Sequence, residues 1–347
     1  MRELCGKMSV KDHSKKILKN LFLLIICAAL ITAPSCSSSK KNKYSVTFTD
    51  VFDTVTEFSA YCNSQNEFDK VSSELHAELL RLHKLYDIYN EYDGIINLAY
   101  MNRVCGESPV IAPYEILSLL KKGQGWCRLT NSRMNIFAGA VLSLWHEYRE
   151  KGDRIPTEEE LKEASKHVSY ESVVIKDDTV YFTDKELKID AGALAKGQVY
   201  IYIMPLLRDS GITDYILNLG GNVTVSGKKP DGLWKVGVQD PDGDGLYTKV
   251  NVSDVSVVTS GDYQRYYEYN GTKYHHIIDL NTLYPASEYR SVTVICRYSW
   301  DADALSTALF LMSIEEGEQL LQQYESEALW IKADGEAVRS AGFSAYE

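Results

Sequence analysis

The sequence of 347 residues lacks several features that would indicate common protein classes. Its seven cysteines include no C-x-x-C pair and no Cys/His spacing that would suit zinc. The apolar run at residues 21–31 would rise only about 16 Å as a helix, whereas a bilayer core is about 30 Å thick. Basic residues are scarce after residue 43: residues 44–347 hold 28 Lys and Arg against 46 Asp and Glu. We therefore expect no nucleic-acid partner, because phosphate binding needs clustered basic side chains.

The first 43 residues resemble a bacterial lipoprotein signal with its tether. Six basic residues precede the apolar run, and Cys36 follows it, preceded by a small residue and followed by Ser and Lys. In such signals the cysteine is lipidated and becomes the mature N-terminus. We expect a signal peptide over residues 1–35, a tether over 36–43 and lipidation of Cys36. The protein would then be anchored by lipid to a bacterial membrane, on its extracytoplasmic side. Simple secretion and an uncleaved anchor are the alternatives.

The cysteines outside the signal are Cys62, Cys105, Cys127 and Cys296. We expect buried free thiols. Disulfides are permitted outside the cytoplasm, and four cysteines allow three pairings among which the sequence does not choose.

Residues 44–347 are expected to form one compact domain. Apolar residues at spacings of three and four predict an amphipathic helix over 67–90. Further helices are expected over 114–129, 137–149, 195–208 and 302–312, and one begins at Thr157 with a capping-box pattern. After residue 169 the alternating or β-branched segments predict strands: ESVVIKD, TVYFTD, ELKIDAG, DYILNLGGNVTVSG, WKVGVQD, KVNVSDVSVVTSG, RYYEYNG, KYHHIID and SVTVICR. Antiparallel meanders outnumber βαβ units, which favours an α+β fold.

Three short patterns carry possible chemistry. Gly220 and Gly221 lie between two predicted strands, so they form neither a Walker loop nor a dinucleotide fingerprint, both of which open into a helix. Asp303 and Thr307 project from one face of a predicted helix, where their hard oxygens would suit Mg²⁺, unless they are a helix cap and a solvated threonine. Of the neighbouring His275 and His276, strand alternation sends only one to a given face.

The order of nine segments resembles the ApbE family, the FAD:protein FMN transferases, over nearly all of residues 44–347. The segments are FDTVTEF, YDIYNEYDGIINLAYMN, LTNSRMNIFAGAVLSLW, IDAGALAKGQ, YILNLGGNVTVSG, WKVGVQDP, VVTSGDYQRYY, YHHIIDL and SVTVICRYSWDADALSTALF. The resemblance implies an α+β, T-fold-related body of two lobes, with a mostly antiparallel sheet and FAD between the lobes. It also implies Mg²⁺-dependent transfer of FMN from FAD to a Thr or Ser hydroxyl of a target electron-transfer protein, with release of AMP.

The resemblance further implies roles for individual residues. Asp303, Thr307 and the main-chain carbonyl of Ala193 would bind Mg²⁺. His276 would act as the general base for the acceptor hydroxyl or would stabilise the phosphate. Contacts with FAD carry over to Phe52, Asp87, Ile88, Tyr89, Arg133, Met134, Asn135, Asp190, Lys196 and Ile277. For Phe52, Ile88, Tyr89 and Met134, packing in the core is the alternative.

Departures from the family pattern leave other functions open. Asn131 and Asn135 stand where the family commonly has carboxylates, so the flavin contact there is open. An Mg²⁺-dependent FAD pyrophosphatase would use the same site with water in place of the hydroxyl, and would produce FMN and AMP. A non-catalytic flavin-binding lipoprotein is the third interpretation, although the retention of Asp303, Thr307 and His276 argues against it.

Overall fold

The computed structural model describes residues 41–347, which form one compact unit. The predicted signal peptide, Cys36 and all but the last three residues of the predicted tether lie outside the described residues. Within residues 41–347, no helix has both the length and the hydropathy that crossing a bilayer requires.

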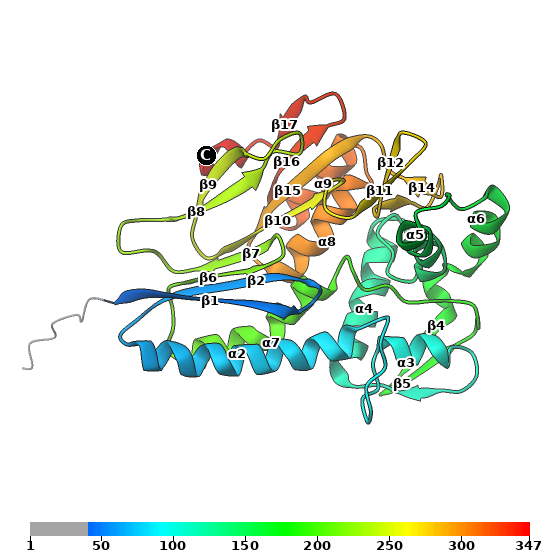
Figure 1. Cartoon of the computed structure of the whole chain (residues 1–347), viewed down its shortest axis with the longest axis horizontal. Coiled ribbons are helices and arrows are strands. Elements are labelled where there is room, and N and C mark those ends of the chain that lie inside the picture. The colour runs from blue at the N-terminus through cyan, green and yellow to red at the C-terminus, as the bar shows by residue number, and fades with distance from the viewer. Residues whose placement is uncertain (1–40) are drawn as a thin grey trace, which may run out of the picture. The chain divides into compact units, whose positions relative to one another are not determined.

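An eight-stranded sheet lies at the centre of the fold (Figure 1). Its spatial order is β1 (Asn42–Val51), β2 (Thr54–Cys62), β6 (Tyr215–Leu219), β7 (Asn222–Ser226), β10 (Val255–Gly261), β15 (Tyr289–Cys296), β16 (Glu327–Lys332) and β17 (Ala337–Arg339). Every neighbouring pair is antiparallel. The predicted α+β class with a mostly antiparallel sheet is therefore confirmed.

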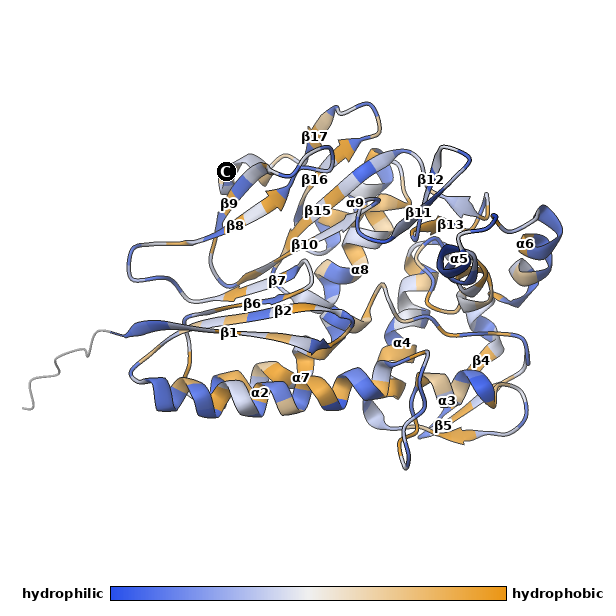
Figure 2. Ribbon diagram, in the orientation of Figure 1, coloured by the Kyte–Doolittle hydropathy of each residue, from blue (hydrophilic) through white to orange (hydrophobic). Residues whose placement is uncertain are grey.

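Three helices cover one face of this sheet: α2 (Gln65–Tyr86), α7 (Ala195–Asp209) and α8 (Ser299–Phe310). The apolar spacing that predicts α2 is also its buried face, because Phe68, Val71, Leu75, Leu79, Leu82 and Leu85 are all buried. Figure 2 shows hydrophobic and hydrophilic residues alternating along α2, as expected of a helix with one face on the core. Helix α7 contacts both α2 and α8, so these helices form one layer.

A hairpin of β8 (Trp234–Gln239) and β9 (Leu246–Val252) packs on the opposite face, together with the short 3-10 helix η3 (Phe343–Tyr346). Valines of the hairpin pack with side chains of β10, β15 and β16, such as Val257, Ile295 and Leu329. These central strands are thus buried on both faces, which explains their nearly continuous apolar sequences.

The eight-stranded sheet with its covering helices and hairpin forms the first lobe, and the second lobe is mostly helical. It contains α3 (Leu98–Arg103), α4 (Tyr114–Leu129), α5 (Gly139–Lys151), α6 (Glu158–Ala164), the 3-10 turns η1 (Ser165–His167) and η2 (Tyr170–Ser172), and a small sheet in the order β3 (Val110–Ile111), β5 (Thr179–Phe182), β4 (Val173–Lys176). The hairpins β11 (Tyr266–Tyr269) with β12 (Thr272–His275), and β13 (Ile278–Asp279) with β14 (Tyr284–Pro285), pack on α5 through Trp145, Tyr267 and Ile278. Helix α9 (Ile314–Gln323) follows α8.

One predicted strand is wrong. The alternation in ELKIDAG is present, since Leu187 and Ile189 are buried, but the segment forms no strand. The side chain of Asn102 instead bonds both backbone groups of Ile189, accepting from its N–H at 2.7 Å and donating to its carbonyl at 2.9 Å. The carbonyl of Lys188 accepts from Gly139 at the start of α5. The backbone groups of this segment therefore bond to a side chain and to a helix end instead of to a neighbouring strand. The segment stays irregular, and it lies beside the site.

Candidate active site

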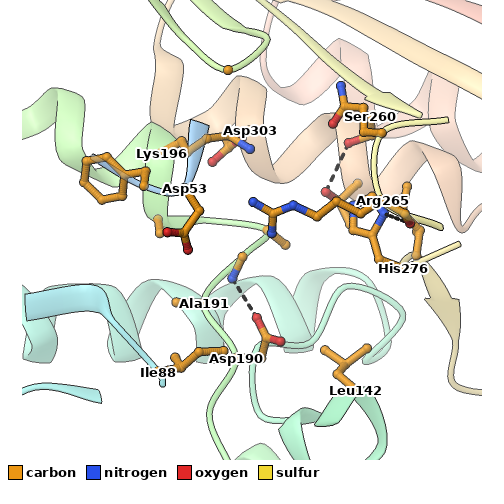
Figure 3. A pocket seen from close by; sticks show the side chains of 18 of the residues that line it. Asp53, Ile88, Leu142, Asp190, Ala191, Lys196, Ser260, Arg265, His276 and Asp303 are labelled. Carbon is orange, nitrogen blue, oxygen red and sulfur yellow. Dashed lines mark hydrogen bonds between the residues drawn. The ribbon is translucent and has the colours of Figure 1, made fainter. Parts of the chain in front are cut away.

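A cleft of about 690 Å³ opens where the two lobes meet (Figure 3). It is lined by the turns β1–β2 and β6–β7, the end of α2, α5, the segment before α7, the loops around residues 260–265 and 276–280, and α8. All the residues predicted to bind metal or FAD or to act in catalysis line it: Phe52, Asp87, Ile88, Tyr89, Arg133, Met134, Asn135, Asp190, Ala193, Lys196, His276, Ile277, Asp303 and Thr307. The structure thus brings these residues together, while their individual roles stay predictions.

The carboxylate of Asp303 lies at the contact between α7 and α8. Its Oδ2 accepts the backbone N–H of Gly197 at 2.8 Å, and the side chain is buried. The two helices approach so closely that a Cβ on Gly197 would lie 2.5 Å from the carbonyl oxygen of Ser299. Burial raises the pKa of Asp303, and the positive charge of Lys196 opposes that rise. A buried carboxylate of this kind gains stability from a nearby cation.

Two further oxygens suit the same cation. None of the turn and cap hydrogen bonds of residues 41–347 ends on the Ala193 carbonyl, and the N–H four residues on, that of Gly197, goes to Asp303 instead. Thr307 Oγ1 lies 3.3 Å from Ser260 Oγ in the cleft. A carboxylate, a hydroxyl and a carbonyl are hard oxygen ligands that fit Mg²⁺. Mg²⁺ takes six ligands, so these three oxygens would leave coordination positions for phosphate oxygens.

His276 presents a free ring nitrogen to the cleft. Its backbone N–H donates to the Arg265 carbonyl at 3.1 Å, and its Nδ1 lies 3.3 Å from that same oxygen. Because a carbonyl only accepts, Nδ1 carries the proton, and no hydrogen bond within residues 41–347 uses the Nε2 lone pair. Burial, followed by the charge of Arg265, lowers the pKa of His276 to about 3. The imidazole is therefore neutral at neutral pH, as a general base must be.

The preceding histidine fixes the backbone here. His275 Nε2 donates to the Ala286 carbonyl at 2.7 Å, while its Nδ1 accepts the N–H of Ile277 at 3.2 Å. This pattern requires a neutral ring protonated at Nε2, the tautomer opposite to that of His276. Burial lowers the pKa of His275 and maintains this state. The neighbouring histidines thus have different roles: His275 bonds the backbone of Ala286 and Ile277, whereas His276 faces the cleft.

The turn between β1 and β2 forms another wall. Phe52 and Asp53 both adopt left-handed backbone conformations, with φ of 56° and 51°, which is uncommon for a residue as bulky as phenylalanine. The Phe52 N–H donates to His83 Nδ1 at 3.1 Å. Against this turn lies the β6–β7 turn, where a Cβ on Gly220 would lie 2.0 Å from Thr54 Oγ1. Gly220 therefore permits the close approach of two turns that line the cleft.

Three of the predicted flavin contacts are already bonded within the protein. Asp87 accepts hydrogen bonds from Tyr89, Asn90 and Tyr92; although burial acts to raise its pKa, these bonds lower it overall. Arg133 pairs with Glu316 through two bonds, at 2.8 and 3.0 Å. The amide of Asn135 accepts from Phe137 N–H and donates to the Val168 carbonyl at 2.9 Å. A carboxylate at 135 could not make the donated bond, which explains the amide locally.

Sequence reasoning missed several polar residues of the cleft. Arg265, Arg149 and His146 all line it, and Arg149 donates a hydrogen bond to His146 Nδ1. The His146 ring lies 4.9 Å from that of Tyr89. Arg265 lies inside one family segment and His146 directly follows another, but a single arginine beside a strand or on a helix carries no signal that separates a cleft from solvent.

The chain is similar to known proteins in sequence and in overall fold. The model of the ApbE family matches residues 50–330. The chain is 30% identical to an FAD:protein FMN transferase of Treponema pallidum over 298 residues, covering 78% of this chain and 81% of that protein. It is 29% identical to one from Klebsiella pneumoniae over 247 residues, covering 70% and 76%. The crystal structure of the ApbE protein from Thermotoga maritima superposes with a TM-score of 0.81 at 28% identity, over 88% of this chain and 99% of that one.

Proposed function

Because the chain belongs to the ApbE family, we propose that it is an FAD:protein FMN transferase, the activity for which its curated relatives are named. The enzyme would transfer FMN from FAD to a Thr or Ser hydroxyl of a target protein in the presence of Mg²⁺, and would release AMP. The bond between the FMN phosphorus and the oxygen bridging to AMP breaks, and the acceptor oxygen forms the new bond to phosphorus. AMP keeps the electron pair.

The single observation that carries this proposal is the content of the cleft. The free Nε2 of His276, the oxygens of Asp303 and Thr307 and the ammonium of Lys196 all lie in one cavity, although they come from distant parts of the chain. His276 would take the proton of the acceptor hydroxyl. Lys196 would pair with phosphate oxygens, since no carboxylate oxygen of residues 41–347 lies within 4.0 Å of its ammonium. Mg²⁺ held by Asp303, Thr307 and Ala193 would neutralise phosphate charge.

We also propose where the protein is located in the cell. Lipidation at Cys36 would place the enzyme on the extracytoplasmic face of a bacterial membrane, where its target would be the flavin-carrying subunit of an electron-transfer protein. The basic and apolar segments that precede Cys36 support this localisation.

The test is direct. Purified protein is mixed with FAD, Mg²⁺ and an acceptor protein that carries an accessible threonine, and the products are followed by flavin fluorescence in a denaturing gel and by AMP release. We expect a fluorescent acceptor band and one AMP per flavin attached. AMP without a labelled acceptor would identify a pyrophosphatase, and neither product would identify a flavin-binding protein; either result would contradict the proposal.

A further inference from the structure

Arg265 is a cation of the cleft to which the proposed reaction, as described so far, gives no role. Its side chain extends into the pocket beside His276 (Figure 3). Within residues 41–347 its guanidinium donates no hydrogen bond, and no carboxylate oxygen lies within 4.0 Å of it. By contrast, Arg133 and Arg149, which also line the cleft, have partners in Glu316 and His146. Arg265 is an exposed residue that lines the cleft, so its guanidinium has donors available to a ligand that enters.

The loop that carries Arg265 is braced. Asp262 accepts from Arg290 Nε at 2.8 Å and from Lys273 Nζ at 3.3 Å, and its N–H donates to the Arg290 carbonyl at 3.0 Å. Arg265 directly precedes β11, and His276 directly follows β12. These strands pair with Tyr266 opposite His275, and the backbone bond from His276 to Arg265 continues the pairing by one step. The guanidinium and the imidazole therefore leave the same end of one hairpin.

We propose that Arg265 stabilises the negative charge that develops on the phosphoryl group under attack, and that it acts mainly on the transition state rather than on bound FAD. This inference rests on the proposed function. The base must stand on the side of the incoming hydroxyl, so a cation that leaves the same end of the hairpin as the base can reach the phosphorus being attacked. Asp303 and Thr307 approach from α8, on a different wall.

The chemical step balances with Arg265 included. The acceptor oxygen bonds to the FMN phosphorus, its proton goes to Nε2 of His276, and the bond from that phosphorus to the bridging oxygen breaks with AMP as the leaving group. Charge spreads over the non-bridging oxygens of the transferred group during this exchange. The guanidinium remains protonated throughout and donates two hydrogen bonds in a fixed planar geometry, which a lysine does not reproduce.

The experiment compares Arg265→Gln, Arg265→Lys and Arg265→Ala with wild type, using Arg208→Gln as the control. Arg208 lies at the far end of α7, where its side chain is 71% exposed and pairs with the neighbouring Asp209. We expect Arg265→Gln to lower kcat by about 10²–10³-fold while the Kd for FAD changes by less than about threefold. Arg265→Lys should retain part of the rate, and added guanidinium ion should partly restore Arg265→Ala without affecting Arg208→Gln. Rescue separates a chemical role from a structural one, even where a variant is less stable.

Two outcomes would overturn the inference alone: wild type transfers FMN and Arg265→Gln transfers it as fast, or the Kd for FAD rises while kcat stays the same. If wild type attaches no FMN to the acceptor, the proposed function is wrong and the role of Arg265 falls with it. The result for the wild-type protein therefore distinguishes a wrong role for Arg265 from a wrong proposed function.

Discussion

The two ring nitrogens of His276 have different surroundings, and this permits a clean substitution. His276→Asn keeps a donor near the Arg265 carbonyl but has no lone pair at the position of Nε2. We expect kcat for FMN transfer to fall by about 10²–10⁴-fold, the usual contribution of a positioned base. The Kd for FAD, measured by quenching of flavin fluorescence, should change little. His76→Asn, a change on the outer side of α2 where His76 pairs with Asp50, is the matched control and should keep the wild-type rate.

The pH dependence of transfer follows from the lowered pKa of His276. A base must be unprotonated, and a pKa moved down from 6.5 to about 3 keeps the ring neutral as the pH falls through 6.5. We therefore expect kcat/KM at saturating Mg²⁺ to stay level from pH 8 down to well below 6.5, and to fall only at more acidic pH. An acidic limb centred at 6.5 would mean that the ring is not shielded as the structure has it.

At the scale of residues, the sequence could predict which residues line the cleft but not their hydrogen-bond partners. The resemblance brought Arg133 and Asn135 to the flavin side of the cleft, and both do line it. It could not reveal that Arg133 pairs with Glu316 or that Asn135 bridges Phe137 and Val168, because these partners lie 183 and 33 residues away along the chain, or depend on a local turn. For the same reason Arg265 could not be told from a surface arginine.

Among the elements, the contact between α7 and α8 gives a sharp test through Gly197. The Gly197→Ala methyl would overlap the Ser299 carbonyl at 2.5 Å and Asp303 Cβ at 2.7 Å. Overpacking of this kind costs about 1–3 kcal/mol, which exceeds the roughly 0.5–1 kcal/mol that alanine gains over glycine inside a helix. We expect a lower urea midpoint and a higher Mg²⁺ concentration for half-maximal rate, because the helix carrying Asp303 must move.

Gly125 in α4 is the matched control, since a Cβ there meets nothing within 4 Å. Gly125→Ala should leave the Mg²⁺ requirement unchanged and should raise the free energy of unfolding by about 0.5–1 kcal/mol. If Gly197→Ala behaved in the same way, the two helices would not be in the contact described.

Element prediction succeeded where one pattern decided the outcome. The helix over 114–129 has the predicted bounds, and the capping box of Thr157 and Glu160 starts α6 as expected. An equal signature, Ser313 with Glu316, starts α9, which was missed. Strands β1, β2, β16 and β17 were also missed. In β1 the inner residues Tyr44, Val46 and Phe48 alternate with polar residues and pack on the core, so this edge strand does carry the alternation of a half-buried strand.

For the molecule as a whole, the cleft is a product of long-range assembly. The turn at Phe52 and the helix at Asp303 are about 250 residues apart, yet both line it. Hydrophobic periodicity specifies which face of an element is buried but not which element covers it. The order of nine family segments carries that missing information in the sequence itself, and it therefore predicted that the candidate residues would lie together.

Membrane attachment of the whole molecule can be tested separately from FMN transfer. The proposed attachment to the membrane is through the lipid at Cys36. We expect Cys36→Ser to abolish incorporation of labelled palmitate in bacterial cells and to reduce the membrane-bound fraction. Cys27→Ser, a change of the same kind inside the apolar run, should keep the label. Because the cleft lies entirely within residues 41–347, a protein beginning at Lys41 should retain FMN transfer in solution; a label that persists in Cys36→Ser would place the lipid elsewhere.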